Sequence, residues 1–87
     1  MRFSVNRLRI GSRSIAARVA GTNSFARATR LAEEYARCNP GIGYLLVDRA
    51  TVNTTPQLIC HRIDGDVHRF SDGEHYLPVI TDLTTRT

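Results

Sequence analysis

The sequence predicts one small α+β domain with the element order β-β-α-β-β-β, in which a single helix packs across an antiparallel sheet. Three observations support this class. Apolar residues recur at helical spacing in one segment, short apolar runs of strand length lie on both sides of it, and turn-forming residues separate those runs. Because 87 residues suffice for one domain and leave no room for a second, 1–87 is predicted to be a single unit, with 80–87 as a frayed polar tail.

The chain up to Val19 is predicted to form a β-hairpin. Phe3 and Val5 alternate with polar residues, as the two faces of a strand require, but the alternation slips by one position before Leu8. An extra residue in one strand shifts the alternation in this way, so the slip predicts a bulge near Asn6. After a Gly-Ser turn, a second alternating run predicts the returning strand.

The helix is predicted over 25–38. Three side chains before it are good N-cap residues, Thr22, Asn23 and Ser24. The Asn-Pro-Gly sequence that starts at Asn39 ends the helix, because proline forces the residue before it out of helical geometry. The apolar face has helical spacing: Phe25, Ala28, Leu31, Ala32, Tyr35 and Ala36. The outer face carries Arg27, Arg30, Glu34 and Arg37. Two pairs of opposite charge at i,i+4 spacing are each expected to contribute about 0.3 kcal/mol: Arg30 with Glu34, and Glu33 with Arg37.

The second half of the chain is predicted to supply the remaining strands. Residues 42–48 contain the longest uninterrupted apolar run and are predicted to be a buried central strand. Residues 57–63 and 67–70 are predicted to pair as a hairpin, because Asp64-Gly65 suits a two-residue turn with positive φ at both positions. Residues 76–80 are expected to add a short edge strand, where a proline is tolerated.

The densest group of chemically capable side chains surrounds this hairpin. In the predicted register His61 lies directly across from His68, and cross-strand Cβ atoms about 5 Å apart would let two imidazoles share a metal. A zinc site needs a third and usually a fourth ligand, and Asp66 and His75 do not complete the set. Cys60 and His61 face opposite sides of a strand, so they do not form a nucleophile and base pair. We therefore predict no catalytic residues, no metal, no cofactor and no enzymatic activity.

The charge of the chain is unevenly distributed. All twelve basic residues are arginine. Residues 1–37 hold eight arginines and two acids, a balance of +6, whereas residues 38–87 hold four arginines and six acids, a balance of −2. A basic surface can follow a phosphate backbone, so one hypothesis is a small nucleic-acid-binding protein that uses the N-terminal hairpin. Its candidate residues are Arg7, Arg9, Arg13 and Arg18.

The sequence contains no apolar stretch of the length that a membrane helix needs and no apolar run behind Arg2 that would make a signal peptide. We therefore expect a cytoplasmic protein with no membrane partner. The two cysteines, Cys38 and Cys60, are too few for a disulfide framework, and both are expected to be small buried apolar residues.

Residues 24–51 resemble small proteins of phages and mobile elements. The resemblance is carried by the run Phe25-Ala-Arg-Ala-Thr-Arg-Leu-Ala-Glu-Glu-Tyr-Ala-Arg, then Asn39-Pro40-Gly41, then Tyr44-Leu-Leu-Val-Asp48. This organisation is similar to that of several anti-CRISPR inhibitors, which are compact domains that bind and block an immune effector. Many such inhibitors are acidic mimics of nucleic acid, and the basic character of this chain does not fit that mechanism.

The leading hypothesis is accordingly a non-enzymatic protein that binds a macromolecule, of the phage-encoded, anti-CRISPR-like inhibitor type. Its partner would be a protein or ribonucleoprotein effector complex, bound through the outer helix face, because arginine is enriched where interfaces derive most of their binding energy. The candidate partner-binding residues are Arg27, Arg30, Glu34 and Arg37. A sheet edge could also support a homodimer.

Overall fold

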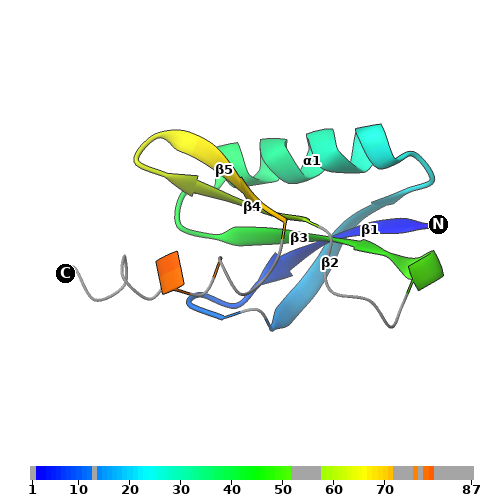
Figure 1. Ribbon diagram of the computed structural model, residues 1–87, viewed down its shortest axis with the longest axis horizontal. Helices are drawn as coiled ribbons and strands as arrows, with labels where there is room; N and C mark the ends of the chain where they lie inside the picture. Colours follow the sequence, from blue (N-terminus) through cyan, green and yellow to red (C-terminus); the bar gives the residue numbers. More distant parts are fainter. Residues whose placement is uncertain (1, 13, 52–57, 72–75, 77, 80–87) are drawn as a thin grey trace.

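The computed structural model describes residues 2–12, 14–51, 58–71, 76, 78 and 79, and these form a five-stranded antiparallel sheet with one α-helix on it (Figure 1). The predicted α+β class and the order β-β-α-β-β-β are confirmed. The elements are β1 (Phe3–Leu8), β2 (Ile15–Thr22), α1 (Phe25–Cys38), β3 (Gly43–Asp48), the 3-10 turn η1 (Arg49–Thr51), β4 (Leu58–Ile63) and β5 (Asp66–Phe70).

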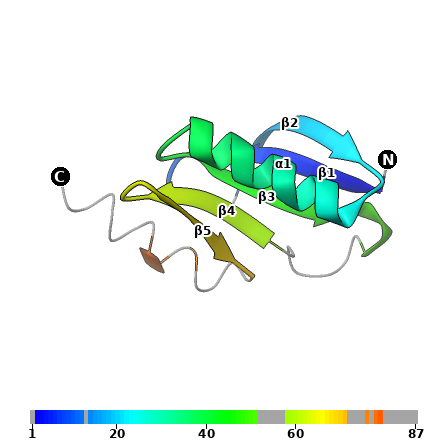
Figure 2. The same cartoon turned by 90° about the horizontal axis from the view of Figure 1, so that it is seen from above.

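The strand order is β2-β1-β3-β4-β5, so that the chain returns from α1 into the middle of the sheet. The predicted central strand is therefore confirmed as β3, which pairs with β1 on one side and β4 on the other. Seen from above, α1 runs along the sheet over its central strands (Figure 2). The two sheet edges are β2 and β5, at opposite sides of the molecule.

The turn between β4 and β5 has the predicted geometry. Asp64 and Gly65 both have positive φ, 53° and 91°, as a two-residue hairpin turn of this kind requires. The register follows from this turn, and it places His61 directly across from His68.

The predicted irregularity near Asn6 is present, but the extra residues belong to β2 and not to β1. The pairing of β1 with β2 shifts between Val5 and Asn6 and again between Arg7 and Leu8, whereas β1 pairs with β3 without interruption. The bulge is thus not the reason for the slipped apolar pattern. Leu8 is buried with the residues of the other sheet face, because that face is covered as well.

Local sequence explains the limits of α1. The Ser24 hydroxyl accepts a hydrogen bond from the backbone N–H of Arg27 at 3.2 Å, which satisfies one of the unpaired amides of the first turn. At the other end the Asn39 side chain donates to the Tyr35 carbonyl at 2.8 Å, and Gly41 follows with a φ of 84°. Of the three N-cap candidates, Ser24 is the residue that caps the helix, and the predicted helix end is confirmed.

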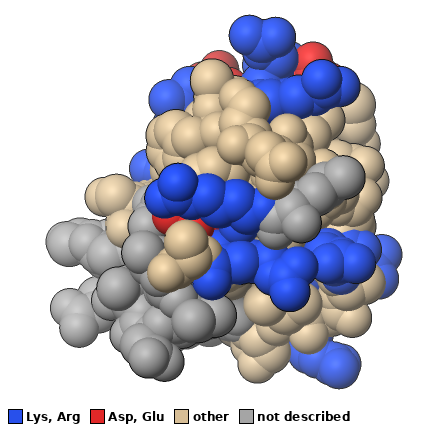
Figure 3. Space-filling view, turned by 90° about the vertical axis from the view of Figure 1, so that its right-hand side faces the viewer, with Lys and Arg blue, Asp and Glu red and all other residues tan. Residues whose placement is uncertain are grey.

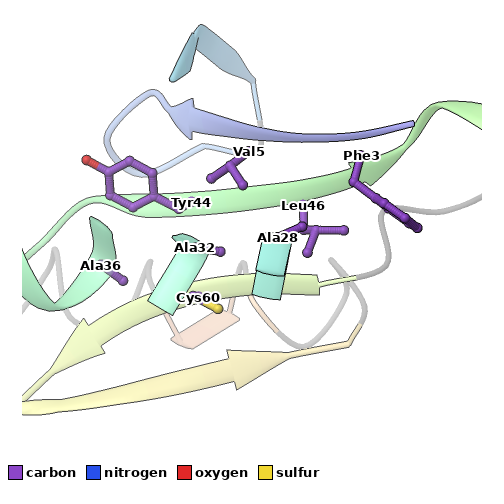
Figure 4. Packing of buried hydrophobic residues seen from close by; sticks show 8 residues of the cluster. All are labelled: Phe3, Val5, Ala28, Ala32, Ala36, Tyr44, Leu46 and Cys60. Atoms are coloured by element: carbon purple, nitrogen blue, oxygen red, sulfur yellow. The ribbon is translucent and has the colours of Figure 1, made fainter. Parts of the chain in front are cut away.

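The core between α1 and the sheet is built on small residues. Ala28, Ala32 and Ala36 lie one above the other at i,i+4 spacing, and all three are fully buried. Their short side chains let the helix backbone approach the strands closely. The helix meets the sheet residues Phe3, Val5, Tyr44, Leu46 and Cys60 (Figure 4).

The opposite sheet face has its own core, centred on Tyr76. This side chain is 1% exposed and packs with Leu8, Leu45 and Ile59. Its hydroxyl lies 3.1 Å from Nδ1 of His61, whose side chain is also buried.

The edge strand predicted over 76–80 is wrong for the residues described there. Tyr76, Pro78 and Val79 have helical backbone. Proline has no N–H to donate to a strand ladder, and its fixed φ suits the first turn of a helix. Tyr76 therefore enters the second core from a helical turn, and β5 is the last strand among the described residues.

The ion pairs predicted along α1 are also wrong. Among the described residues, neither Arg30 with Glu34 nor Glu33 with Arg37 forms an ion pair. Glu33 pairs instead with Arg69 of β5, which joins the helix to the edge of the sheet. Glu33 therefore pairs across the fold and not with Arg37 on its own helix. An exposed i,i+4 pair contributes too little free energy to compete with this long-range contact.

Candidate functional site

Three of the four residues predicted to bind a partner surround one hollow on the outer face of α1. Arg27, Arg30 and Glu34 are exposed and line a hollow of about 400 Å³. The remaining lining residues are Ser24, Ala26 and Leu31. We call this surface the helix hollow. Its arginines make no ion pair with any acid that the structure describes, so their charge is available to a partner.

Arg37, the fourth predicted residue, lies outside the helix hollow. Its side chain is exposed in the last turn of α1, where a cation interacts favourably with the helix dipole. Its backbone carbonyl accepts a hydrogen bond from Nη1 of Arg62 at 2.9 Å. Arg62 therefore fixes the end of α1 to β4, and Arg37 extends the basic face along the helix.

A second, more apolar hollow of about 310 Å³ continues from the first along the flank of α1. Leu31 and Glu34 line both. The other residues of the second hollow are Tyr35, Cys38 and Asn39. The Tyr35 hydroxyl donates to the Val19 carbonyl at 3.3 Å, so this flank of the helix lies above β2.

Two of the arginines predicted for a nucleic-acid surface on the hairpin, Arg7 and Arg18, lie on opposite faces of the sheet. Arg7 pairs with Tyr44 and lies on the helix side of the sheet. Burial raises the pKa of the Tyr44 phenol, and the nearby Arg7 guanidinium opposes that rise. Arg18 pairs with Asn6 and so faces the other side. Arg9 is exposed beyond the end of β1, and Arg13 lies outside the described residues.

Arg18 instead lines a groove of about 560 Å³ together with Arg49, a residue that the sequence analysis did not select. The groove crosses the start of β1, and its other lining residues are Phe3, Ser4, Val19, Ala20 and Gly21. We call it the strand groove. Arg49 follows β3 directly, and no local pattern links it to Arg18, which is 31 positions earlier in the numbering of the chain. Only the strand order brings the two together.

The end of the molecule where β1 begins is rich in arginine. Figure 3 looks onto this end and shows arginine atoms in a band across it, with little acidic surface in view. Arg2 forms two hydrogen bonds at 3.1 Å to the Asp48 carboxylate. These hydrogen bonds hold the pKa of Asp48 below its ordinary value, although burial acts in the opposite direction. The acid at this end therefore stays ionised and is neutralised by Arg2.

The two histidines of the β4–β5 hairpin differ in burial: His61 is buried and His68 is exposed. Burial lowers the pKa of His61, and the neighbouring His68 lowers it further, so the His61 ring is neutral at physiological pH and free to bond Tyr76. His68 is exposed on the same sheet face. Within the described ranges, no group of three or more His, Cys, Asp and Glu side chains is arranged to hold a metal ion.

Both cysteines are free. Burial raises the pKa of the Cys60 thiol to about 11, because the thiolate would be desolvated and would also face Glu33. Cys60 is therefore an inert core residue on the helix side of the sheet. The expected burial is thus correct for Cys60 and wrong for Cys38, which is exposed because it is the last residue of α1.

Comparisons with family models, with curated proteins and with solved structures find no match to this chain. None of the helices formed by the described residues is long and apolar enough to cross a lipid bilayer. The helix hollow and the strand groove are therefore interpreted from their own chemistry.

Proposed function

We propose that this protein is a non-catalytic inhibitor that binds an acidic surface of a macromolecular partner through the helix hollow. The observation that supports the proposal is the grouping of Arg27, Arg30 and Glu34 around one depression on an exposed helix face. A rigid helix presents these side chains in a fixed arrangement, which lowers the entropy lost on binding.

The mixed chemistry of the helix hollow favours a protein partner. Arg27 and Arg30 can form charge-assisted hydrogen bonds with carboxylates, while Glu34 provides an acceptor for a basic group on the partner. Leu31 adds an apolar contact between them. Arginine beside a desolvated apolar residue is typical of the positions that dominate the energy of protein interfaces.

The partner class that we propose is an effector complex of a CRISPR immune system, either protein or ribonucleoprotein. The resemblance of residues 24–51 to small phage inhibitors supports this class. Those residues include the whole of α1 and therefore the helix hollow.

The test is a phage infection assay in bacteria with an active CRISPR system, using a panel of system types and expressing the chain in each. We expect plaque formation to be restored in at least one host by the wild-type chain and lost with Arg27→Glu/Arg30→Glu. In a binding assay with the effector of that host, the same variant should lose at least about tenfold in affinity, or about 1.4 kcal/mol.

The matched control is Arg7→Glu/Arg9→Glu, which changes the net charge equally at two exposed residues that do not line the helix hollow. It should inhibit like the wild type. Equal loss in both variants would show that total charge and not the helix hollow is responsible. If plaques were restored in none of the hosts, the proposed partner class would be contradicted. Circular dichroism must show that both variants are folded.

A further inference from the structure

The strand groove differs from the helix hollow in one respect that indicates a different ligand. Among the described residues that line it, Arg18 and Arg49 are the charged ones and none is acidic. In the helix hollow, by contrast, Glu34 stands beside the arginines. We infer that the strand groove binds the phosphodiester backbone of a nucleic acid, with Arg18 and Arg49 contacting its phosphates. This inference does not depend on the function proposed for α1.

The two arginines reach the groove from opposite sides. β2 and β3 both lie next to β1, so Arg18 on β2 and Arg49 just after β3 line the groove from the two sides of β1. A phosphate lying over β1 can therefore be contacted from both sides. The planar guanidinium group donates two parallel hydrogen bonds to phosphate oxygens, which suits arginine to this role.

The floor of the groove also offers a donor. The Ser4 hydroxyl accepts a hydrogen bond from Nδ2 of Asn6 at 3.1 Å, and the same Asn6 amide group donates to the Leu45 carbonyl at 3.3 Å. Ser4 therefore accepts one hydrogen bond, and among the described residues its own hydroxyl proton has no acceptor. Gly21 of β2 also lines the groove, and because it has no side chain a ligand can approach the backbone there.

The groove is held in shape before any ligand binds. The backbone N–H of Arg49 donates to the Arg2 carbonyl at 2.7 Å, and the N–H of Ala50 donates to Oδ1 of Asp48 at 3.0 Å. These bonds fix the turn η1 that carries Arg49. On the other wall, the register shift of β2 next to Arg18 sets the direction of that strand.

A polymer fits this end of the molecule better than a single phosphate. The arginine band in Figure 3 continues on both sides of the centre of the face. The nearest described acid, Asp48, is neutralised by Arg2. Consecutive phosphates of one strand can therefore meet several guanidinium groups, whereas a free phosphate can meet only those of the groove.

The experiment is a titration of fluorescently labelled single-stranded DNA, single-stranded RNA and duplex DNA, each read by anisotropy over a series of salt concentrations. Each phosphate neutralised contributes about 0.7 for single strands, or about 0.9 for duplex DNA, to the slope of log affinity against log salt. For Arg18→Ala/Arg49→Ala we expect a loss of about tenfold in affinity at low salt, and a slope smaller by about 1.4 on single strands.

The control Arg7→Ala/Arg9→Ala removes the same charge from exposed residues outside the groove and should keep most of the affinity and nearly the whole slope. Arg18→Lys/Arg49→Lys keeps the charge but not the paired hydrogen bonds, so it should bind between the wild type and the alanine variant. It also tests the proposal if the alanine variant does not fold.

Three outcomes would overturn the inference. The first is no binding of any of the three nucleic acids at low salt. The second is an equal loss in the groove and control variants, which would mean that the attraction is general and not located in the groove. The third is equally strong competition by inorganic phosphate at the same phosphate concentration, which would mean that the ligand is a single anion and not a polymer.

Discussion

On the sheet face that α1 covers, the buried residues of the helix are alanines, whereas on the opposite face one large ring, Tyr76, occupies the space beside the strands. The first face consists of apolar side chains at regular helical and strand spacing. The second face combines apolar residues with buried polar ones, among them Ser4, Asn6 and His61. The two faces therefore tolerate different changes. The helix face should be sensitive to enlargement, and the opposite face to loss of a single group.

The largest effect is expected for Tyr76→Ala. Tyr76 is fully buried, and its ring meets Phe70 edge-on at 5.3 Å between centroids, so truncation removes both burial and this contact. Replacing a buried aromatic residue by alanine typically costs about 3–5 kcal/mol, and we expect a value near the middle of that range. Urea denaturation followed by circular dichroism measures the change in the free energy of unfolding. Tyr76→Phe, which keeps the ring, should lose much less; equal losses would show that the hydroxyl and not the ring is decisive.

Ala32→Leu tests the helix face. Ala32 is fully buried at the middle of the alanine row, where extra carbons must push α1 away from the sheet. Overpacking of a core typically costs about 1–3 kcal/mol, and we expect the upper part of this range. The control is Ala26→Leu on the exposed side of the same helix, which should leave the free energy of unfolding nearly unchanged. If both variants were neutral, the close approach of helix and sheet would not depend on alanine.

Gly43→Ala tests how Tyr76 and His61 meet on the opposite face. Gly43 lies across from His61, and a Cβ there would stand 2.3 Å from the Tyr76 hydroxyl and 3.1 Å from Cζ of its ring. The missing side chain is therefore what lets Tyr76 reach His61. We expect a loss of about 2 kcal/mol in the free energy of unfolding. Adding Tyr76→Phe to Gly43→Ala should recover part of it, and a double variant that loses the sum of both costs would contradict this account.

The helix face could be predicted from the sequence because its signals are local. Ser24 caps the start of the helix and Asn39 caps its end, and each of these residues bonds to a group within four positions of itself. The alanine spacing is likewise a pattern within one helix. The hairpin turn was equally predictable, because Asp64-Gly65 favours its geometry without help from the rest of the fold. Short-range chemistry was a sufficient guide in both cases.

The second core could not be predicted in this way. Tyr76 meets His61 across 15 positions of the sequence, and no spacing rule connects them. One signal was available: Leu8 and the unbroken apolar run of β3 are out of phase with a sheet that buries a single face. A second covered face explains both Leu8 and the unbroken apolar run of β3, and no bulge in β1 is needed.

The candidate sites divide along the same line. Arg27, Arg30 and Glu34 were found because helical spacing places them together. Arg49 was not found, because its proximity to Arg18 depends on the insertion of β3 beside β1. Residues that meet through strand order, whether in the core or in the strand groove, are invisible to a reading of local pattern.

The smallest expected effect is the part of the acid dependence of stability that arises from His61 on the opposite face. Burial, with a further contribution from His68, lowers the pKa of His61 in the folded protein below its ordinary value of 6.5. The unfolded chain therefore binds a proton at His61 at a higher pH than the folded chain does. The resulting stability is fully present above about pH 6.5 and is lost as the pH falls through the folded pKa.

His61→Gln tests this account, since glutamine does not titrate but can still form a hydrogen bond with the Tyr76 hydroxyl. Comparing the free energy of unfolding near neutral pH with that at about pH 5, we expect a smaller decrease for the variant than for the wild type. His68→Gln, at the exposed residue across the strand pair, should remove only the smaller contribution and keep most of the decrease. If the free energy of unfolding fell equally in the wild type and in His61→Gln, the acid sensitivity would arise from another group. His61 would then not make the opposite face differ from the face beneath α1 in its response to acid.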